Sequence, residues 1–293
     1  MAAQESSIPY WKRHRRWLPE EEYRAKVERG EIAPARTDEN VIRGDALIAQ
    51  IKEESGCDIC LMAFSTGKDA LAAYTHIRPR FSRVVPFYMY GIPDLSFIEE
   101  SLRYYEKHLT DEPILRMPHP SLYEMLGRLL WQPPERVAVL EAADLLNIGY
   151  THQFLRELLC EEAKIPPTCF IATGVRAGDS PMRRLNIITN GPINRADGTF
   201  MPIWDWKKSA VMKSVNATGL KLPVDYEMFG RTFDGFNVDY LQPIKERFPA
   251  DYQRILDWFP LADSDIFRKR KALEHQRIKN AEHVVEQYRM RAW

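Results

Sequence analysis

The sequence predicts an α/β protein with a doubly wound parallel sheet and helical extensions at both ends of the chain. First, short apolar runs alternate with longer amphipathic segments, the pattern of parallel strands joined by crossover helices. Second, the runs at 57–64 and 168–174 are almost continuously apolar, as expected of central strands buried on both faces. Third, each of these two runs ends in a turn of small residues that includes a glycine.

The elements of this fold follow one another between residues 19 and 174. Leu47, Ile48 and Ile51 fall on one face of a predicted helix. Ser96 and Glu99 have the spacing of a capping box, which predicts the start of another helix. In chain order, we expect helix 19–29, helix 41–54, strand 57–64, helix 69–76, strand 84–90, helix 96–109, strand 113–117, helix 121–130, helix 141–164 and strand 168–174.

Composition divides the chain into three parts. We expect a basic, helical N-terminal extension over 1–55, an α/β domain over 56–262 and a basic C-terminal segment over 263–293, formed by one helix or a pair of helices. Within the α/β domain, residues 185–260 are rich in Trp, Pro, Gly and Asp, which predicts short elements there.

Length and charge restrict the class of protein without naming a partner. A chain of 293 residues is long enough to bury a large core, and its formal net charge is zero. No apolar stretch approaches the roughly 18 residues that a membrane helix needs, and residues 1–5 lack the apolar core of a signal peptide. We therefore expect a soluble, cytoplasmic protein that has no membrane partner and whose oligomeric state is open.

The four cysteines are too sparse for a disulfide scaffold. Cys57 and Cys60 lie in the first predicted strand, where residues three apart point to opposite faces. They also lie at the end of the strand away from its small-residue turn. We therefore interpret them as buried packing residues, rather than as a redox pair or part of a metal site or iron–sulfur cluster.

A loop of small and charged residues, Ser65 to Asp69, follows the first predicted strand. Ligands of open parallel sheets bind beyond the carboxyl ends of the strands, and the N-terminus of the next helix attracts phosphate. Ser65 and Thr66 offer hydroxyl donors. Gly67 lets the backbone approach an anion, and Lys68 adds a charge-assisted hydrogen bond. Asp69 can bind magnesium or cap its own helix. The loop is therefore either a phosphate site or a polar turn that begins a helix.

A second polar segment, from Gly174 to Arg184, follows the strand predicted at 168–174. Arg176, Arg183 and Arg184 carry planar guanidinium groups, which suit phosphate or sulfate. Because both segments follow parallel strands, we expect them at the same edge of the sheet. The segment is therefore either an anion site, with Ser180 as a further donor, or a surface loop with solvated charges.

The segment 64–70, Phe-Ser-Thr-Gly-Lys-Asp-Ala, resembles the PP-loop Ser-Gly-Gly-Lys-Asp-Ser of the ATP pyrophosphatases, also called adenine nucleotide alpha hydrolases. Thr66 stands in place of a glycine, and Ala70 in place of the last serine. This family includes the phosphoadenosine phosphosulfate reductases, in which a Gly-x-Arg…Ser…Arg segment similar to 174–184 contacts the anionic groups of the nucleotide. The resemblance implies a Rossmann-like fold of the adenine nucleotide alpha hydrolase type, with a PP-loop nucleotide-binding domain over 56–262.

Two later segments extend the resemblance to about residues 57–235. Segment 201–211 resembles the Pro-Ile/Leu-x-x-Trp-x-x-x-Asp-Val element of the same group, with alanine in place of its acidic residue. Segment 222–231 resembles its Leu-Pro-x-x-Tyr stretch. The tryptophans of the first segment are expected to be packing residues. Arg231 ends the second segment and Asp234 follows it in a glycine-bearing loop, and the two either close over a substrate or pair with each other.

The resemblance implies ATP, or phosphoadenosine phosphosulfate, as the ligand, together with magnesium. ATP would be cleaved between its α- and β-phosphates, so that an acceptor is adenylated and pyrophosphate leaves, in sulfur transfer or in nucleic-acid modification. We expect Lys68, Asp69 and Arg176 to be catalytic, and Asp69 to bind the metal. The expected nucleotide-binding residues are Ser65, Thr66, Gly67, Lys68, Asp69, Gly174, Arg176, Ser180, Arg183, Arg184 and Arg231.

Two alternatives stay open. Reductases of this family carry a cysteine in a C-terminal Glu-Cys-Gly-Leu-His element, whereas this chain has no cysteine after Cys169. A phosphosulfate nucleotide would therefore need the thiol of a partner protein. The other alternative is a non-catalytic nucleotide- or nucleic-acid-binding subunit of a phage or defence system. Related proteins act in DNA phosphorothioation and beside ParB-like partners.

Both ends of the chain are basic. Four Lys or Arg residues within 12–16 lie between Trp11 and Trp17. Segment 266–293 contains eight Lys or Arg (268, 269, 270, 271, 277, 279, 289, 291) and three acidic residues (274, 282, 286), a net charge of +5. Such patches are typical of nucleic-acid binding, and the alternative is a pair of solvated helix faces.

Overall fold

The computed structural model of the chain divides into two compact units, Met1–Val41 and Ile42–Trp293. In the first unit, the described residues of the helix expected over 19–29 are helical up to residue 28, and Gly30 has a φ of 71°. The basic segment 11–17 lies outside the described residues. The structure describes residues 21, 25–26, 28–31, 38–146 and 148–291.

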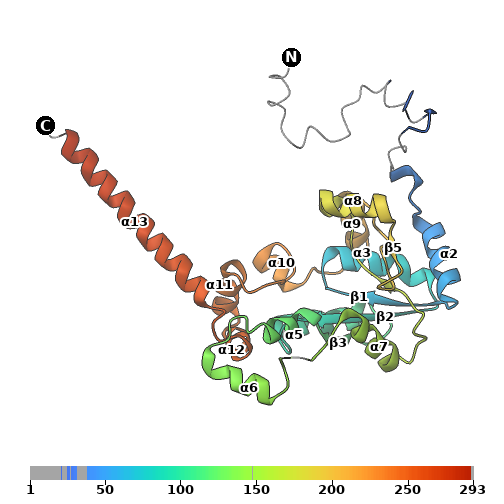
Figure 1. The fold of residues 1–293 in the computed structure, drawn as a ribbon, viewed down its shortest axis with the longest axis horizontal. Coiled ribbons are helices and arrows are strands. Elements are labelled where there is room, and N and C mark those ends of the chain that lie inside the picture. The colour runs from blue at the N-terminus through green and yellow to red at the C-terminus, as the bar shows by residue number, and fades with distance from the viewer. Residues whose placement is uncertain (1–20, 22–24, 27, 32–37, 147, 292–293) are drawn as a thin grey trace. The chain divides into compact units, whose positions relative to one another are not determined.

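The second unit contains a six-stranded sheet with the strand order β3-β2-β1-β4-β6-β5 (Figure 1). All neighbouring strands are parallel except β5 and β6, which are antiparallel. The chain moves outward in one direction from β1 to β3 and then crosses to β4, on the other side of β1. The expected α/β class is confirmed: the sheet is mostly parallel, is flanked by helices and is compatible with a Rossmann-like fold. The strands are β1 (Ile59–Ala63), β2 (Arg83–Tyr90), β3 (Leu115–Pro118), β4 (Ile171–Ala172), β5 (Ile193–Asn194) and β6 (Thr199–Phe200).

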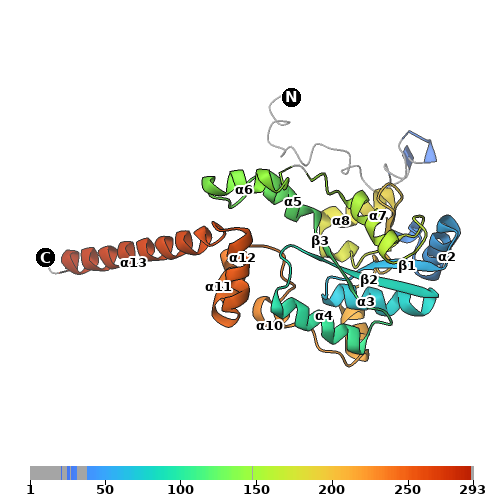
Figure 2. The ribbon, with the colours of Figure 1, turned by 90° about the horizontal axis from the view of Figure 1, so that it is seen from below.

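Helices cover both faces of the sheet. α3 and α7 lie on opposite faces, as both Figure 1 and Figure 2 show. α2, expected over 41–54, lies in the same unit as the sheet, buries Leu47, Ile48 and Ile51, and ends at Gly56 in a left-handed conformation. The helices of this unit are α2 (Gly44–Ser55), α3 (Lys68–Ile77), α4 (Ser96–His108), α5 (Pro120–Gly127), α6 (Val137–Ala142), α7 (His152–Glu162), α8 (Pro181–Asn190), α9 (Lys208–Ala217), α10 (Val224–Phe229), α11 (Val238–Arg247), α12 (Pro249–Trp258) and α13 (Ser264–Arg291).

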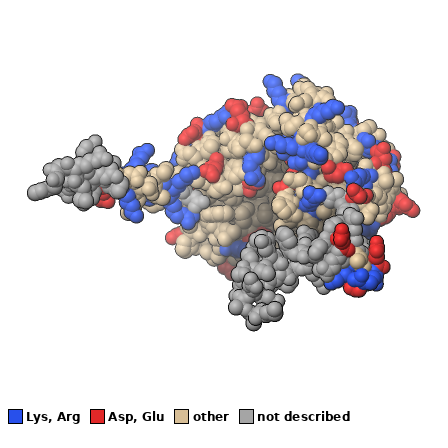
Figure 3. Space-filling view, turned by 90° about the horizontal axis from the view of Figure 1, so that it is seen from above, with Lys and Arg blue, Asp and Glu red and all other residues tan. Residues whose placement is uncertain are grey.

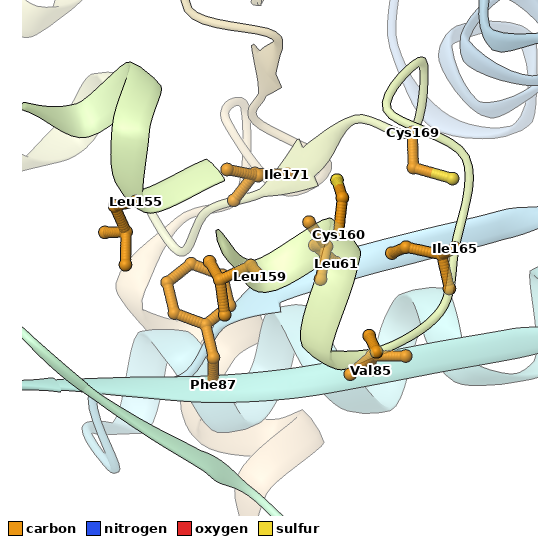
Figure 4. Close-up of a cluster of buried hydrophobic side chains, with 10 residues drawn as sticks. Leu61, Val85, Phe87, Leu155, Leu159, Cys160, Ile165, Cys169 and Ile171 are labelled. Atoms are coloured by element: carbon orange, nitrogen blue, oxygen red, sulfur yellow. The ribbon is translucent and has the colours of Figure 1, made fainter. Parts of the chain in front are cut away.

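The central strand β1 is buried on both faces, as its nearly continuous apolar run predicts. On one face, Leu61 packs with Phe87 of β2 and with Leu155 and Leu159 of α7 (Figure 4). Met62, next along the strand, points to the opposite face and is also fully buried. Buried side chains therefore pack against this strand on both faces of the sheet.

The single helix predicted over 141–164 is wrong. The chain forms two helices, α6 and α7, and the described residues between them are not helical. Asp144 and Gly149 have left-handed φ angles of 55° and 64°, which a continuous helix cannot accommodate. α7 begins at His152, and the side chain of its N-cap Thr151 accepts a hydrogen bond from the Phe154 N–H at 3.2 Å.

The capping box predicted at Ser96 and Glu99 is also wrong, because the cap comes from a distant helix. The buried carboxylate of Asp251, in α12, accepts hydrogen bonds from the Ser96 N–H at 2.9 Å and from the Ser96 hydroxyl at 2.6 Å. Glu99 instead pairs with Arg116 of β3 at 3.2 Å. The start of α4 is therefore tied to a segment about 155 positions later.

The C-terminal segment forms one helix, α13, rather than a pair. Near its start, the Lys269 ammonium pairs with Asp239 of α11 at 2.8 Å. Farther along, described side chains such as Leu273 and Ile278 are exposed. Among the described residues, none of the helices is long and apolar enough to cross a membrane.

Candidate functional site

The loop predicted to bind phosphate connects the end of β1 to the start of α3. α3 begins at Lys68, with Gly67 as its N-cap. Thr66 has a φ of 61°, a left-handed conformation that costs a β-branched residue roughly 1–2 kcal/mol. The Thr66 hydroxyl donates to the Ser65 carbonyl oxygen at 2.6 Å, so its proton is already engaged. Thr66 is buried, whereas Ser65 faces solvent at the edge of the sheet.

A later segment covers this loop. The backbone N–H of Lys68, the first of α3, donates to the Tyr226 hydroxyl at 3.2 Å. A Cβ at Gly67 would lie 3.1 Å from the Thr232 methyl carbon and 3.4 Å from the Tyr226 hydroxyl oxygen. A glycine at position 67 therefore allows close packing, and its φ is one that other residues also adopt. The sequence missed this contact because residues 226 and 232 are distant along the chain.

The second predicted segment meets the first at the carboxyl edge of the sheet. Gly174 follows β4, and β4 is the parallel neighbour of β1. A Cβ at Gly174 would lie 2.9 Å from the Ala70 nitrogen and 2.9 Å from the Asp69 carbonyl carbon. Only glycine permits this approach, so the turn after β4 packs directly on the first turn of α3.

Arg176 connects the two segments through its guanidinium. Its Nε donates to Asp69 Oδ1 at 2.7 Å, and one terminal nitrogen donates to Asp179 Oδ1 at 2.7 Å. The other terminal nitrogen donates to the Trp206 carbonyl oxygen at 3.2 Å. The Arg176 side chain is only 6% exposed. Its position matches the prediction that the two segments come together, but its donors are engaged by protein groups.

Asp69 is held between two cations. Its Oδ2 accepts from the Lys68 ammonium at 2.5 Å, and its Oδ1 accepts from Arg176. Magnesium prefers carboxylate oxygens that are free to bind it, and in this arrangement neither oxygen of Asp69 is free. Among the described residues, no group of three or more His, Cys, Asp or Glu side chains is arranged to hold a metal. The residues present therefore do not fit a protein-held magnesium ion.

The other predicted arginines lie on the surface. The Ser180 side chain caps α8 by accepting from the Arg183 N–H at 3.2 Å. Arg183 pairs with Asp179 at 3.1 Å and is 54% exposed, and Arg184 is exposed beside it. Arg231 pairs with Asp234, which agrees with the second of the two alternatives considered for them. Asp179 thus links Arg183 to the Arg176 network, whereas Arg231 lies outside that network.

A cavity of about 510 Å³ opens beside the loop at the carboxyl ends of β1, β2 and β3. Ser65 belongs to its wall, and so does Asp234, the partner of Arg231. Aromatic rings dominate the rest of the lining, a composition typical of small-molecule sites. These rings belong to Phe64, Phe87, Tyr88, Trp131, Phe233 and Phe236.

Asp225 is a buried carboxylate in the wall of this cavity. It is 1% exposed, and its Oδ2 accepts from the Phe233 N–H at 3.1 Å. Its Oδ1 is buried and has no hydrogen-bond partner among the described residues. Burial raises the pKa of this carboxyl group, and the Phe233 N–H opposes the shift. An unsatisfied buried oxygen is costly, and this one belongs to a residue of the cavity wall.

His119 is a second titratable group that sequence reasoning missed. It follows β3 and lines the cavity. Its Nδ1 accepts from the Ser121 N–H at 3.1 Å, which places the proton of the neutral ring on Nε2. Burial lowers the pKa of His119, and the neighbouring His152 lowers it further. The sequence feature that could have indicated His119 is its position at the carboxyl end of a predicted strand. For Asp225, that feature is its position within segment 222–231.

The site therefore has two adjoining parts. One is the network of Lys68, Asp69 and Arg176 at the junction of the loops, and the other is the aromatic cavity with Asp225 and His119. No family model matches the chain, and a search of curated proteins finds no match either.

Proposed function

We propose that the chain binds ATP, or a related adenine nucleotide, at the carboxyl edge of its sheet and transfers the adenylate group to an acceptor. One observation carries this proposal: the loops that follow β1 and β4 meet through Asp69 and Arg176, beside an aromatic cavity. The strand order reverses between β1 and β4, and open α/β sheets bind their ligands at such a point. Together with the PP-loop resemblance of segment 64–70, this position favours a fold of the adenine nucleotide alpha hydrolase type.

The aromatic cavity suits the base and sugar of the nucleotide. Rings such as Tyr88 and Phe233 offer apolar walls for a planar base. The free Oδ1 of Asp225 can accept an N–H from the exocyclic amino group of adenine, or an O–H from the ribose. Either donor would satisfy an oxygen that is otherwise buried without a partner. We therefore assign Asp225 to recognition of the nucleoside.

The loop suits the phosphates. Ser65 lines the cavity, and the N-terminus of α3 supplies partial positive charge. The Tyr226 hydroxyl oxygen, which accepts from the Lys68 N–H, marks a position that an anionic oxygen can take. In this proposal Asp69 and Arg176 hold Lys68 and the two loops in place, while Ser65 and Lys68 contact the nucleotide.

The reaction follows from this placement. A nucleophilic atom of the acceptor attacks the α-phosphorus, the bond from that phosphorus to the bridging oxygen breaks, and pyrophosphate leaves. The Lys68 ammonium and the α3 N-terminus stabilise the negative charge that develops on the leaving group. The Nε2–H of the neutral His119 ring can donate a hydrogen bond to the bound nucleotide, and the proton of the acceptor passes to solvent.

The phosphosulfate alternative uses the same cavity but needs an external thiol. Cys57, Cys60, Cys160 and Cys169 are all free thiols, and the cavity lining contains none of them. A phosphosulfate group bound at the loop would therefore react only with the thiol of a partner protein. A ParB-like protein as the partner of this chain remains a prediction that follows only from the family resemblance.

Calorimetry of the full chain with ATP and with phosphoadenosine phosphosulfate tests the proposal. We expect ATP to bind, and pyrophosphate to appear when an acceptor is present. Lys68→Met should weaken ATP binding by roughly 10-fold to 100-fold, because a charge-assisted hydrogen bond is worth about 1.5–3 kcal/mol. Lys107→Met, which removes an exposed ammonium at the end of α4, is the matched control. Tighter binding of the phosphosulfate nucleotide would favour the alternative, and binding of neither nucleotide would contradict both.

A second candidate function is nucleic-acid binding through α13. Residues 268–271 are four consecutive cations, all of them exposed, and Figure 3 shows blue side chains along the described part of this helix. Part of this charge is already neutralised, because Lys269 pairs with Asp239 and Lys271 pairs with Glu274. The remaining positive charge suits a phosphate backbone. This function is compatible with the first, since a nucleic acid can be the acceptor.

A further inference from the structure

Two cysteines meet at the edge of the sheet opposite the candidate site. Cys57 lies just before β1 and Cys169 just before β4, which are parallel neighbours. Their sulfur atoms are 3.0 Å apart. Both are free thiols, and a disulfide bond measures about 2.05 Å, so a movement of about 1 Å would join them.

We propose that Cys57 and Cys169 are an oxidation site, at which a peroxide converts the two thiols into a disulfide that joins β1 to β4. Cys57 and Cys60 were both expected to be buried packing residues; Cys60 is fully buried, whereas Cys57 is only partly buried. The Cys60 thiol contacts the carbonyl oxygens of Leu61 and Phe170. The partner of Cys57 lies 112 positions away, which the local sequence pattern cannot indicate.

Exposure separates the roles of the two sulfurs. Cys57 is partly exposed, whereas Cys169 is fully buried. Burial opposes ionisation of Cys57, but its hydrogen bonds with Cys169, with the Ile59 backbone and with Ser55 outweigh this effect, so the pKa of Cys57 is lowered. Burial and the neighbouring Cys57 raise the pKa of Cys169 to about 12. Cys57 is therefore the accessible thiolate that attacks the oxidant, and Cys169 is the resolving thiol.

The chemistry balances with hydrogen peroxide as the oxidant. The Cys57 thiolate attacks one peroxide oxygen, the O–O bond breaks, and Cys57 sulfenic acid and hydroxide form. The Cys169 sulfur then attacks the Cys57 sulfur, the S–O bond breaks, and the Cys169 proton leaves with the hydroxyl group as water. The two thiols lose two electrons to the peroxide. A dithiol reductant reverses the change.

The disulfide would fix the two strands whose other ends carry the candidate site. Ser65 follows β1 and Gly174 follows β4, at the carboxyl ends of the same pair. A cross-link between residues 112 apart also restricts the unfolded chain strongly. We expect the oxidised protein to unfold at a temperature roughly 5–10 °C higher than the reduced protein.

The test treats the full folded chain with hydrogen peroxide, blocks remaining thiols with iodoacetamide and maps cross-linked peptides by mass spectrometry without reduction. We expect one cross-link, Cys57 to Cys169, which disappears after dithiothreitol, together with the higher melting temperature. Cys60→Ala and Cys160→Ala are matched controls and should retain this cross-link. In Cys169→Ala, dimedone should trap a sulfenic acid at Cys57.

Any one of three results would overturn the proposal. The first is that the chain is folded by circular dichroism but forms no Cys57–Cys169 cross-link, and the second is that Cys60 or Cys160 forms cross-links equally often. The third is that the Cys169→Ala variant gives no dimedone adduct at Cys57. None of these measurements involves a nucleotide, so the proposal stands or falls independently of the proposed function.

Discussion

Arg176 is the residue on which the junction of the two loops depends. It is 6% exposed and donates to Asp69, to Asp179 and to the Trp206 carbonyl oxygen. Removing it would leave two partly buried carboxylates without their shared cation. We expect Arg176→Ala to lower the free energy of unfolding by about 3 kcal/mol, measured by urea denaturation.

Arg183 supplies the control for this prediction. It pairs with the same Asp179 but is 54% exposed, and exposed ion pairs contribute at most about 1 kcal/mol. Arg183→Ala should therefore change the urea midpoint little. Equal losses in the two variants would show that burial does not decide the energetics of this network.

The raised pKa of Asp225 makes its contribution to the free energy of unfolding depend on pH with the opposite sign to that of most carboxylates. Because burial raises its pKa, the folded chain holds this proton more tightly than the unfolded chain does. Stability is therefore lost as pH rises from the ordinary Asp value of about 3.9 through the raised pKa of the folded state. Asp225→Asn, which can still accept from Phe233, should increase the urea midpoint at pH 7, and the gain should shrink as pH falls through the raised pKa.

The same substitution should weaken ATP binding. Asp225→Asn replaces the free carboxylate oxygen with an N–H donor, which we expect to raise the Kd for ATP by about 10-fold in calorimetry. Glu227→Gln, on the same helix α10 but 71% exposed, is the control for both measurements. A stabilised Asp225→Asn that binds ATP as tightly as the original chain would remove Asp225 from the site.

At the residue scale, the sequence predicted polar groups more reliably than their partners. Residue type and position after a strand indicated Lys68, Asp69 and Arg176, and the structure brings these three together. Their pairing with one another, rather than with solvent, depends on side-chain geometry that no spacing encodes. The unpaired oxygen of Asp225 was not predictable for the same reason, since it depends on which groups the fold packs around it.

The contact between the turn after β4 and the start of α3 leads to a prediction at the scale of elements. A Cβ at Gly174 would lie 2.9 Å from backbone atoms of residues 69 and 70, and backbone cannot rotate away as a flexible side chain can. We expect Gly174→Ala to cost about 1–3 kcal/mol in urea denaturation and to weaken ATP binding as well.

Gly178→Ala is the matched control, because it adds the same methyl group to the same segment. There the Cβ would lie 3.7 Å from an Arg176 nitrogen, an ordinary van der Waals contact. Its stability should stay within about 0.5 kcal/mol of the original chain. If Gly178→Ala were as harmful as Gly174→Ala, the close approach at Gly174 would not be the reason for its glycine.

At the element scale, the alternation of strands and helices was predictable from apolar periodicity, whereas starts and stops were not. The break between α6 and α7 arises at Asp144 and Gly149, within a stretch whose helical pattern continues on both sides. The cap of α4 is supplied by Asp251, so the local signal at Ser96 misled. Both errors have one physical cause, which is that tertiary contacts override local propensity.

For the whole molecule, the parallel sheet was predictable but the order of its strands was not. Crossover helices imply parallel pairing, yet nothing local indicates that β4 returns to the side of β1 opposite β2. That return is what brings the two predicted loops together. The helical C-terminal segment was predictable from composition, but the sequence did not decide between one helix and a pair of helices. The structure has one helix, α13.

Nucleic-acid binding through α13 should show itself as a dependence on salt. Arg277→Glu with Lys279→Glu, both exposed on α13, should weaken binding to DNA or RNA and reduce the slope of log K against log salt by almost 2. Fluorescence anisotropy at several salt concentrations measures this slope. Lys213→Glu with Lys221→Glu makes the same change of charge elsewhere on the surface. Equal losses in both double variants would mean that only net charge matters.

The two edges of the sheet bear on how the protein behaves at high concentration. One edge is β5, which has two residues, and the other is β3, which has four, includes Pro118 and carries Arg116 paired with Glu99 and Glu106. A strand from another molecule would therefore find few free backbone donors, a proline and a cluster of charges. Self-association by strand addition, the first step toward fibrils, is thus disfavoured at both margins of this fold.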